Sequence, residues 1–195
     1  MFKSIRLFAA AFPVFLFTSL TIAQTKPVTA LPHVDVPATQ ARAEDVASID
    51  GIMKAFYEVI SGPAGQPRQW SRDRSLYISD VRFVSMSEDK ASHPKASVVS
   101  HQQFIDASNA SLVKDGFYES EIHRVTEKFG NIAHVFSTYE SRVKANGPVI
   151  ARGINSMELF YDGKRWWVAS VIWDDERPDN PLAPEYLPEK DSLKK

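Results

Sequence analysis

The stretch that decides the fold is Phe117–Glu176. It reads FYESEIHRVTEKF-GN-IAHVFSTYESRV over residues 117–143 and ARGINSMELFY-DG-KRWWVASVIWDDE over residues 151–176. The pairs Gly130-Asn131 and Asp162-Gly163 are typical of two-residue hairpin turns, because those turns need positive φ. Helix-like segments come earlier in the chain. Helices followed by a long antiparallel meander predict an α+β fold whose cupped sheet encloses a pocket.

The elements before the meander follow from periodicity and capping. Residues 43–60 and 100–116 carry apolar stripes at helical spacing, and the second segment opens with a capping-box pattern. Between them, residues 70–78 indicate a short helix, 81–86 a strand and 87–96 a polar loop. No internal repeat is present in the sequence.

The N-terminus has the pattern of a secretory signal peptide. Lys3 and Arg6 precede an almost wholly apolar run at residues 7–23, and small residues end that run before Gln24. The alternative is an uncleaved membrane anchor, because the run just reaches the minimum length of a spanning helix. Pro13 and the small residues favour cleavage before Gln24. We therefore expect an exported protein, periplasmic or secreted from a bacterium, with no stable membrane anchor after cleavage.

Charge and cysteine content exclude several function classes. Lys3 and Arg6 leave with the signal peptide, so the formal net charge falls from −1 to −3, with no basic run. We therefore expect no nucleic-acid partner. The chain has no cysteine, which excludes thiol catalysis and thiolate metal sites. The core must supply the stability that disulfides give many exported domains.

The sequence divides into four parts. They are a signal peptide (1–23), an extended linker (24–43), the folded domain (44–176) and a proline-rich C-terminal tail (177–195).

If each of these two-residue turns is the whole loop of its hairpin, the pairing of residues across both hairpins is fixed. Residues paired in this way lie on the same face of the sheet. In the first hairpin this register places Tyr118, Ser120 and Ile122 on the inner face. It places Glu119 and Glu121 on the outer face. With side chains contributed by the first helix, the predicted pocket lining is Phe56, Tyr57, Tyr118, Tyr139, Asn155, Met157, Leu159, Trp166, Val168 and Ser170.

The last strand carries apolar residues on both faces, whereas a strand with one solvent-exposed face would alternate apolar and polar residues. Something must therefore cover the outer face, and we favour a second copy of the chain over the proline-rich tail. The residues predicted at that homodimer interface are Val125, Phe136, Ile154, Trp167, Val171 and Trp173.

From about Asp45 to Glu176 the chain resembles the nuclear transport factor 2-like superfamily, in its SnoaL-like and exported unknown-function branches. The resemblance rests on the order of elements and on the ending Asp162-Gly163-Lys164-Arg165-Trp166-Trp167-Val168. It implies a cone-shaped α+β roll of the cystatin-like or SnoaL-like kind. In that fold a strongly curved antiparallel sheet wraps around two to three N-terminal helices. The resemblance also implies a cavity at the open end and frequent dimers, but no particular function.

Ketosteroid isomerase and its SnoaL-like relatives place an Asp or His base opposite a Tyr or a protonated Asp. By that resemblance, Asp80 and Asp174 are the carboxylate candidates, and Tyr57 and Tyr139 are the candidate electrophilic partners. The alternative, which we favour, is that both tyrosines are core residues whose hydroxyl groups find a partner.

No metal site or cofactor is expected. His123 and His134 share a face in the predicted register but lie roughly 14 Å apart along it, too far for one ion. The sequence also has no Gly-x-Ser-x-Gly elbow for a serine hydrolase.

Three function hypotheses remain. The first is non-catalytic binding of a small, largely apolar molecule in the cone. The second is a homodimeric interaction module. The third is an isomerase, dehydratase or cyclase that uses Asp and Tyr.

Overall fold

The structure is a computed structural model that describes residues 31–189. The predicted signal peptide, the first part of the linker and the last six residues of the tail lie outside the described residues. Among the residues described, no helix is long and apolar enough to cross a membrane.

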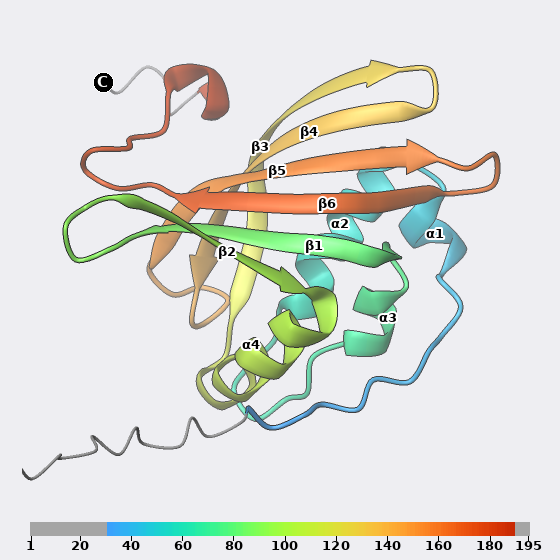
Figure 1. Ribbon diagram of the computed structural model, residues 1–195, viewed down its shortest axis with the longest axis horizontal. Helices are drawn as coiled ribbons and strands as arrows, with labels where there is room; N and C mark the ends of the chain where they lie inside the picture. The colour runs from blue at the N-terminus through green and yellow to red at the C-terminus, as the bar shows by residue number, and fades with distance from the viewer. Residues whose placement is uncertain (1–30, 190–195) are drawn as a thin grey trace, which may run out of the picture. The chain divides into compact units, whose positions relative to one another are not determined.

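A six-stranded curved sheet dominates the structure (Figure 1). Its strand order is β2-β1-β6-β5-β4-β3. The strands are β1 (Tyr77–Glu88), β2 (Pro94–Ser100), β3 (Tyr118–Phe129), β4 (Ile132–Arg142), β5 (Ala151–Tyr161) and β6 (Trp166–Asp175).

The predicted α+β class with a curved sheet is confirmed, with two corrections. The sheet is mixed, because β1 runs parallel to β6 while every other neighbouring pair is antiparallel. Residues 87–96 were predicted to form a loop, but β2 begins within them, at Pro94. This edge strand is exposed at Pro94–Val98, so it lacks the alternation of apolar residues that reveals a half-buried strand.

Helices cover the inner face of the sheet. They are α1 (Ala43–Val46), α2 (Ile49–Ile60), α3 (Trp70–Arg74) and α4 (His101–Asp115), with a short 3₁₀ turn, η1 (Pro184–Tyr186), in the tail. The predicted helix 70–78 ends at Arg74, and its last two residues belong to β1. Ser48 caps α2 by accepting a hydrogen bond from Gly51 N at 3.0 Å. Ser100 and Gln103 form the predicted capping box of α4.

The core lies between α2 and the inner face of the sheet. Ile52 and Val59 of α2 are fully buried, as are Val135, Met157 and Val168 of the sheet. Each such side chain contributes roughly 1.5–3 kcal/mol through burial of apolar surface. This packing fixes α2 beneath the sheet.

The tail lies on the outer face of the sheet. Thr138 Oγ1 donates a hydrogen bond to Tyr186 O at 2.7 Å, and the rings of Phe136 and Tyr186 lie 5.6 Å apart. Leu182 and Leu187 are buried. The tail thus covers part of the face that the predicted homodimer would use. The homodimer itself stays a prediction.

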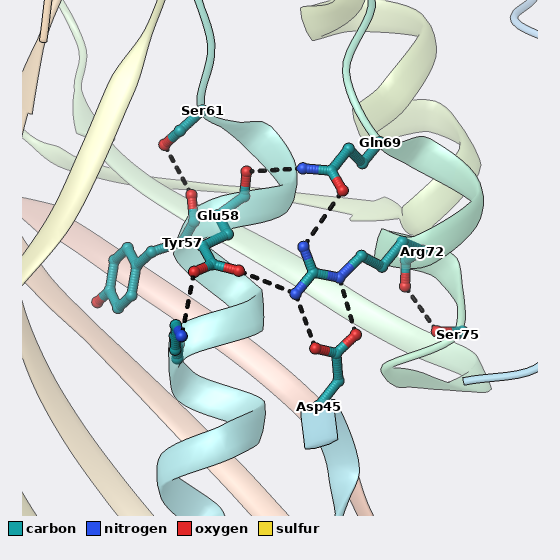
Figure 2. Close-up of polar contacts among 8 residues, drawn as sticks. Asp45, Tyr57, Glu58, Ser61, Gln69, Arg72 and Ser75 are labelled. Atoms are coloured by element: carbon teal, nitrogen blue, oxygen red, sulfur yellow. Dashed lines mark hydrogen bonds and ion pairs between the residues drawn. The ribbon is translucent and has the colours of Figure 1, made fainter. Parts of the chain in front are cut away.

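An arginine cluster joins the three N-terminal helices (Figure 2). Arg72 of α3 donates to both carboxylate oxygens of Asp45 in α1, at 2.8 and 2.7 Å. It also donates to Glu58 of α2 at 2.9 Å. The Asp45 side chain is only 4% exposed, and its hydrogen bonds with Arg72 hold its pKa below the usual value. The cluster therefore fixes the helices that form one wall of the interior.

Replacing Arg72 by Ala should lower the free energy of unfolding by about 3 kcal/mol, because it leaves Asp45 buried without its cation. Urea unfolding followed by circular dichroism measures the change. Lys54→Ala is the matched control. Lys54 pairs with the same Glu58, but its side chain is 76% exposed, so its loss should cost about 0.5 kcal/mol or less. Equal costs for the two variants would contradict this account of the cluster.

Candidate functional site

A cavity of about 340 Å³ lies beneath β3–β6, between the sheet, α2 and α4. Its walls are largely aromatic and aliphatic. The apolar lining residues are Phe56, Ile60, Phe83, Phe104, Leu112, Phe117, Ile150, Ala151, Val171 and Trp173. The polar ones are Ser108, Glu119, Tyr139, Ser141, Asn155 and Asp175. Ile150 and Asp175 are exposed, so the cavity opens beside them.

Glu119 reaches this cavity because β3 contains a β-bulge. Toward the turn, His123 pairs with Thr138 as predicted, but Glu121 pairs with Tyr139 and Glu119 with Ser141. Ile122 is the extra residue, and it reverses the facing of the residues before it. The predicted placement of Tyr118, Ser120 and Ile122 inside, with Glu119 outside, was therefore wrong.

A second bulge, at Ala169 of β6, brings Asp175 to the inner face. The loop of this hairpin has four residues rather than two, because Asp162 Oδ1 accepts from Lys164 N and Arg165 N, each at 2.8 Å. Tyr161 therefore pairs with Trp166.

Beyond Ala169 the shift changes the facing of β6. Met157 pairs with Val171 and Asn155 with Trp173. Val171, Trp173 and Asp175 consequently point inward, so the predicted place of Val171 and Trp173 on an outer interface was wrong.

The backbone of Glu119 is anchored to the end of α2. Glu119 N donates to Ser61 Oγ at 3.0 Å, and Ser61 Oγ in turn donates to Tyr57 O at 2.7 Å (Figure 2). Gly62 and Phe117 exchange two backbone hydrogen bonds beside it, at 2.7 and 3.0 Å. The position of the Glu119 carboxyl is therefore set by both the sheet and the helix.

Tyr139 reaches across a glycine to the carboxyl of Asp175. The two residues stand on β4 and β6, with Gly153 of β5 between them. The Tyr139 hydroxyl donates a hydrogen bond to Asp175 Oδ1. A Cβ atom on Gly153 would lie 2.3 Å from the backbone oxygen of Asp174, 2.5 Å from the Tyr139 hydroxyl and 2.8 Å from Cζ of its ring. A glycine is needed here because a backbone carbonyl and a crossing side chain both approach the strand too closely for a Cβ atom.

The electrostatic setting of Glu119 is unusual for a glutamate. Burial among protein atoms raises the pKa of its carboxyl to about 8. The negative charge of Asp175 adds to the rise, and the Asn155 amide, which favours the charged form, opposes it. Within residues 31–189, no Lys, Arg or His side chain lines the cavity. Glu119 is therefore largely protonated near neutral pH.

A chain of hydrogen bonds leads away from the cavity. Asn155 Nδ2 donates to the Tyr57 hydroxyl at 3.2 Å, and that hydroxyl lies 2.6 Å from Ser137 Oγ. Ser137 Oγ donates to Glu121 Oε2. Since Ser137 uses its proton toward Glu121, the Tyr57 hydroxyl donates to Ser137. Burial raises the pKa of Tyr57, so this hydroxyl stays protonated as a donor.

The structure places the predicted pocket residues in four settings. Phe56, Tyr139 and Asn155 line the cavity. Met157, Leu159, Trp166 and Val168 are buried in the core. Tyr57 and Tyr118 line a separate hollow, of about 450 Å³, on the other side of Glu119. Ser170 pairs with the exposed Glu158 and so lies on the outer face.

Neither predicted aspartate lines the cavity. Asp80 is exposed on β1 and accepts a hydrogen bond from Ser79. Asp174 faces outward and binds Arg177 at the base of the tail. The carboxyls that line the cavity are those of Glu119, which the predicted register placed on the outer face, and Asp175, which was not among the predicted site residues. The sequence signal at Asp175 was its place at the end of the apolar last strand.

Of the predicted interface residues, four lie on the outer face of the sheet. Phe136 and Ile154 line a hollow beside the tail, and Val125 is partly exposed. The Trp167 indole nitrogen donates a hydrogen bond to Asp162 Oδ2, and the Arg165 guanidinium lies over the Trp167 ring, 3.6 Å from the ring centre. Trp167 therefore makes both contacts with residues of its own chain.

The comparisons with known proteins bear on the fold. No protein-family model matches the sequence. No curated protein matches it either.

Among solved structures, the chain is similar to a protein of unknown function with a cystatin-like fold from Nostoc punctiforme. The TM-score is 0.51 at 8% identity, over 74% of this chain and 99% of that one. It is also similar to a protein of unknown function from Mycobacterium tuberculosis. There the TM-score is 0.50 at 14% identity, over 68% of this chain and 73% of that one. The predicted cystatin-like fold is thus confirmed. At these identities the likeness shows the fold alone.

Gly153→Ala should lower the free energy of unfolding by about 1–3 kcal/mol, because the new methyl group collides with the Asp174 backbone carbonyl and with the Tyr139 hydroxyl. Chemical unfolding monitored by tryptophan fluorescence measures the loss. Tyr139→Phe is the comparison, since it removes the hydrogen bond to Asp175 without a clash and should cost about 1 kcal/mol. If Gly153→Ala is as stable as the wild type, the close contacts around position 153 do not require a glycine.

Proposed function

We propose that the protein binds a small, largely apolar molecule in the cavity beneath β3–β6. The observation that carries the proposal is a cavity of about 340 Å³ with aromatic walls and a few converging polar groups. Small-molecule sites in proteins have this composition and volumes of about 300 to 1,000 Å³. The apolar walls would bury the body of the ligand. Glu119, Asn155, Tyr139 and Asp175 would orient its polar end.

The proposal places this binding outside the cytoplasm. Residues 1–23 carry the charged start, apolar run and small-residue end of a cleaved signal peptide. Because the chain has no cysteine, its fold does not depend on disulfide formation in that compartment.

A cavity-filling variant tests the site. Ser108 on α4 lines the cavity, so Ser108→Phe should occupy it and abolish binding. Purified wild type is screened against a library of small organic molecules by thermal shift, and hits are checked by native mass spectrometry. The wild type should be stabilised by at least one ligand, and Ser108→Phe by none.

Ala110→Phe is the matched control, because it adds the same side chain at an exposed position of the same helix. It should keep the wild-type ligand response. Circular dichroism of both variants establishes that they fold. Unchanged binding to folded Ser108→Phe would move the site away from this cavity.

A second candidate function is proton transfer by Glu119, with the cavity serving as an active site. It is favoured by one observation, a cavity carboxyl with a pKa of about 8. A group that titrates near neutral pH can both accept and donate a proton at working pH. In this version Glu119 takes the role that the sequence assigned to Asp80 or Asp174, with Tyr139 or Asn155 as the hydrogen-bond donor.

Deuterium exchange separates the two functions. A ligand found in the screen is incubated with the protein in D₂O, and incorporation at carbon is followed by proton NMR. An enzyme of this kind should exchange an acidic C–H of the ligand, and Glu119→Gln should slow that exchange by at least about 100-fold. Binding without any exchange would leave the non-catalytic function.

A further inference from the structure

We propose that the ligand of the cavity is a small organic ammonium ion, an amine with an apolar body that enters in its protonated form. This inference rests on the proposed binding function and deepens it by assigning the charge of the ligand.

The charged groups of the cavity are all acidic. Glu119 and Asp175 line it, and within the described part of the chain no basic side chain does. Neither carboxyl has an ion-pair partner within residues 31–189. Asp175 accepts a hydrogen bond from Tyr139, and Glu119 interacts with the Asn155 amide. An ammonium group between the two carboxyls would supply the missing positive charge and up to three hydrogen-bond donors.

The walls suit a cation with an apolar body. Phe83 and Phe104 stack with their ring centres 4.9 Å apart, and Trp173 meets Phe104 edge-on at 6.1 Å. Aromatic faces attract cations, and the attraction grows where water is excluded. The same rings bury hydrocarbon. An anionic ligand would meet two carboxyls without a counter-charge, so this cavity disfavours carboxylates and phosphates.

The groups that face Glu119 define how binding depends on pH. They are Asp175 of β6, Tyr139 of β4, Asn155 of β5 and Tyr57 of α2, and the charge of Glu119 also acts on Tyr77 of β1. Glu121 of β3 lies beyond Tyr57 in the same network. On the other side of Glu119, the hollow holds Asp50, Glu58, Lys54 and Arg142. Lys54 already pairs with Glu58, and Arg142 with Glu140.

Binding of a cation should therefore release a proton. With a pKa of about 8, Glu119 is mostly protonated at pH 7, and a bound ammonium favours its ionised form. Affinity should rise with pH until Glu119 is ionised, by up to about tenfold per pH unit below pH 8. It should fall again once the amine loses its own proton, near pH 10.

Three probes with one carbon skeleton test the charge. They are 3-phenylpropylamine, 3-phenylpropan-1-ol and 3-phenylpropanoate, which present a cation, a neutral hydroxyl and an anion. Isothermal titration calorimetry of the purified protein at pH 6, 7 and 8 measures their dissociation constants. Repeating the amine titration at pH 7 in buffers of different ionisation enthalpy measures the protons released. The amine should bind at least about tenfold more tightly than the alcohol at pH 8, and the anion should bind weakest.

Charge-removing variants identify the carboxyl involved. Glu119→Gln should weaken amine binding about 10- to 100-fold and abolish proton release, while changing alcohol binding by less than about threefold. Asp174→Asn is the matched control. It removes the same charge next to Asp175 but on the outer face, and should leave all three affinities unchanged.

The outcomes distinguish this inference from the function on which it rests. The ammonium assignment is overturned if the alcohol or the anion binds as tightly as the amine, or if amine binding is insensitive to Glu119→Gln. It is also overturned if the library screen yields ligands of another charge while the amine does not bind. In each of these cases the binding function stands. The binding function itself fails if Ser108→Phe leaves every affinity unchanged.

Discussion

Strict alternation of side chains along a β-strand governs what this protein can hold in its interior. Successive residues point to opposite faces, and one extra residue in a strand reverses the facing of everything beyond it. The sheet uses this property at Ile122 and at Ala169. Near the turns, alternation brings Val135, Met157 and Val168 together in an apolar core. Past the bulges, the same strands present Glu119 and Asp175 to the inner side.

The two carboxyls share one apolar space, and that has an energetic consequence. Burial raises the pKa of Glu119 to about 8, and the like charge of Asp175, with no basic side chain lining the cavity among the described residues, adds to the rise. Tyr139 partly compensates Asp175 by reaching over Gly153. The arginine cluster at Arg72 and the bonds between Ser61 and Glu119 hold the opposite wall in place. The interior is thus held by contacts on both sides, wide enough for a small molecule, and acidic.

The two long helices and the first hairpin turn could be predicted from the sequence, but the site could not. Capping by Ser48 and Ser100 could be predicted, because those signals are local and their partners lie three residues away. The first hairpin turn was also right, since Gly130 adopts the positive φ that its position requires. The site depended on the two bulges and on the four-residue loop built around Asp162. A bulge changes no residue type, so nothing in the pattern of Tyr118–Glu121 distinguishes a bulged strand from a regular one. The position of the tail could not be predicted either, because the contact between Tyr186 and Phe136 joins distant parts of the sequence and has no local signature.

The bulges also determine how changes in chain length act on this fold. Loss of Ile122 would remove the bulge and leave the other pairs of β3 and β4 as they are, because Ile122 is the residue without a partner, so Glu119 and Glu121 would stay on the inner face. Pairing Ile122 with Tyr139 at unchanged chain length would instead turn Tyr118 and Ser120 inward in place of Glu119 and Glu121. Asp175 of β6 would line the cavity in both cases. The bulge therefore holds one of the two cavity carboxyls in place without contributing a side chain to the site.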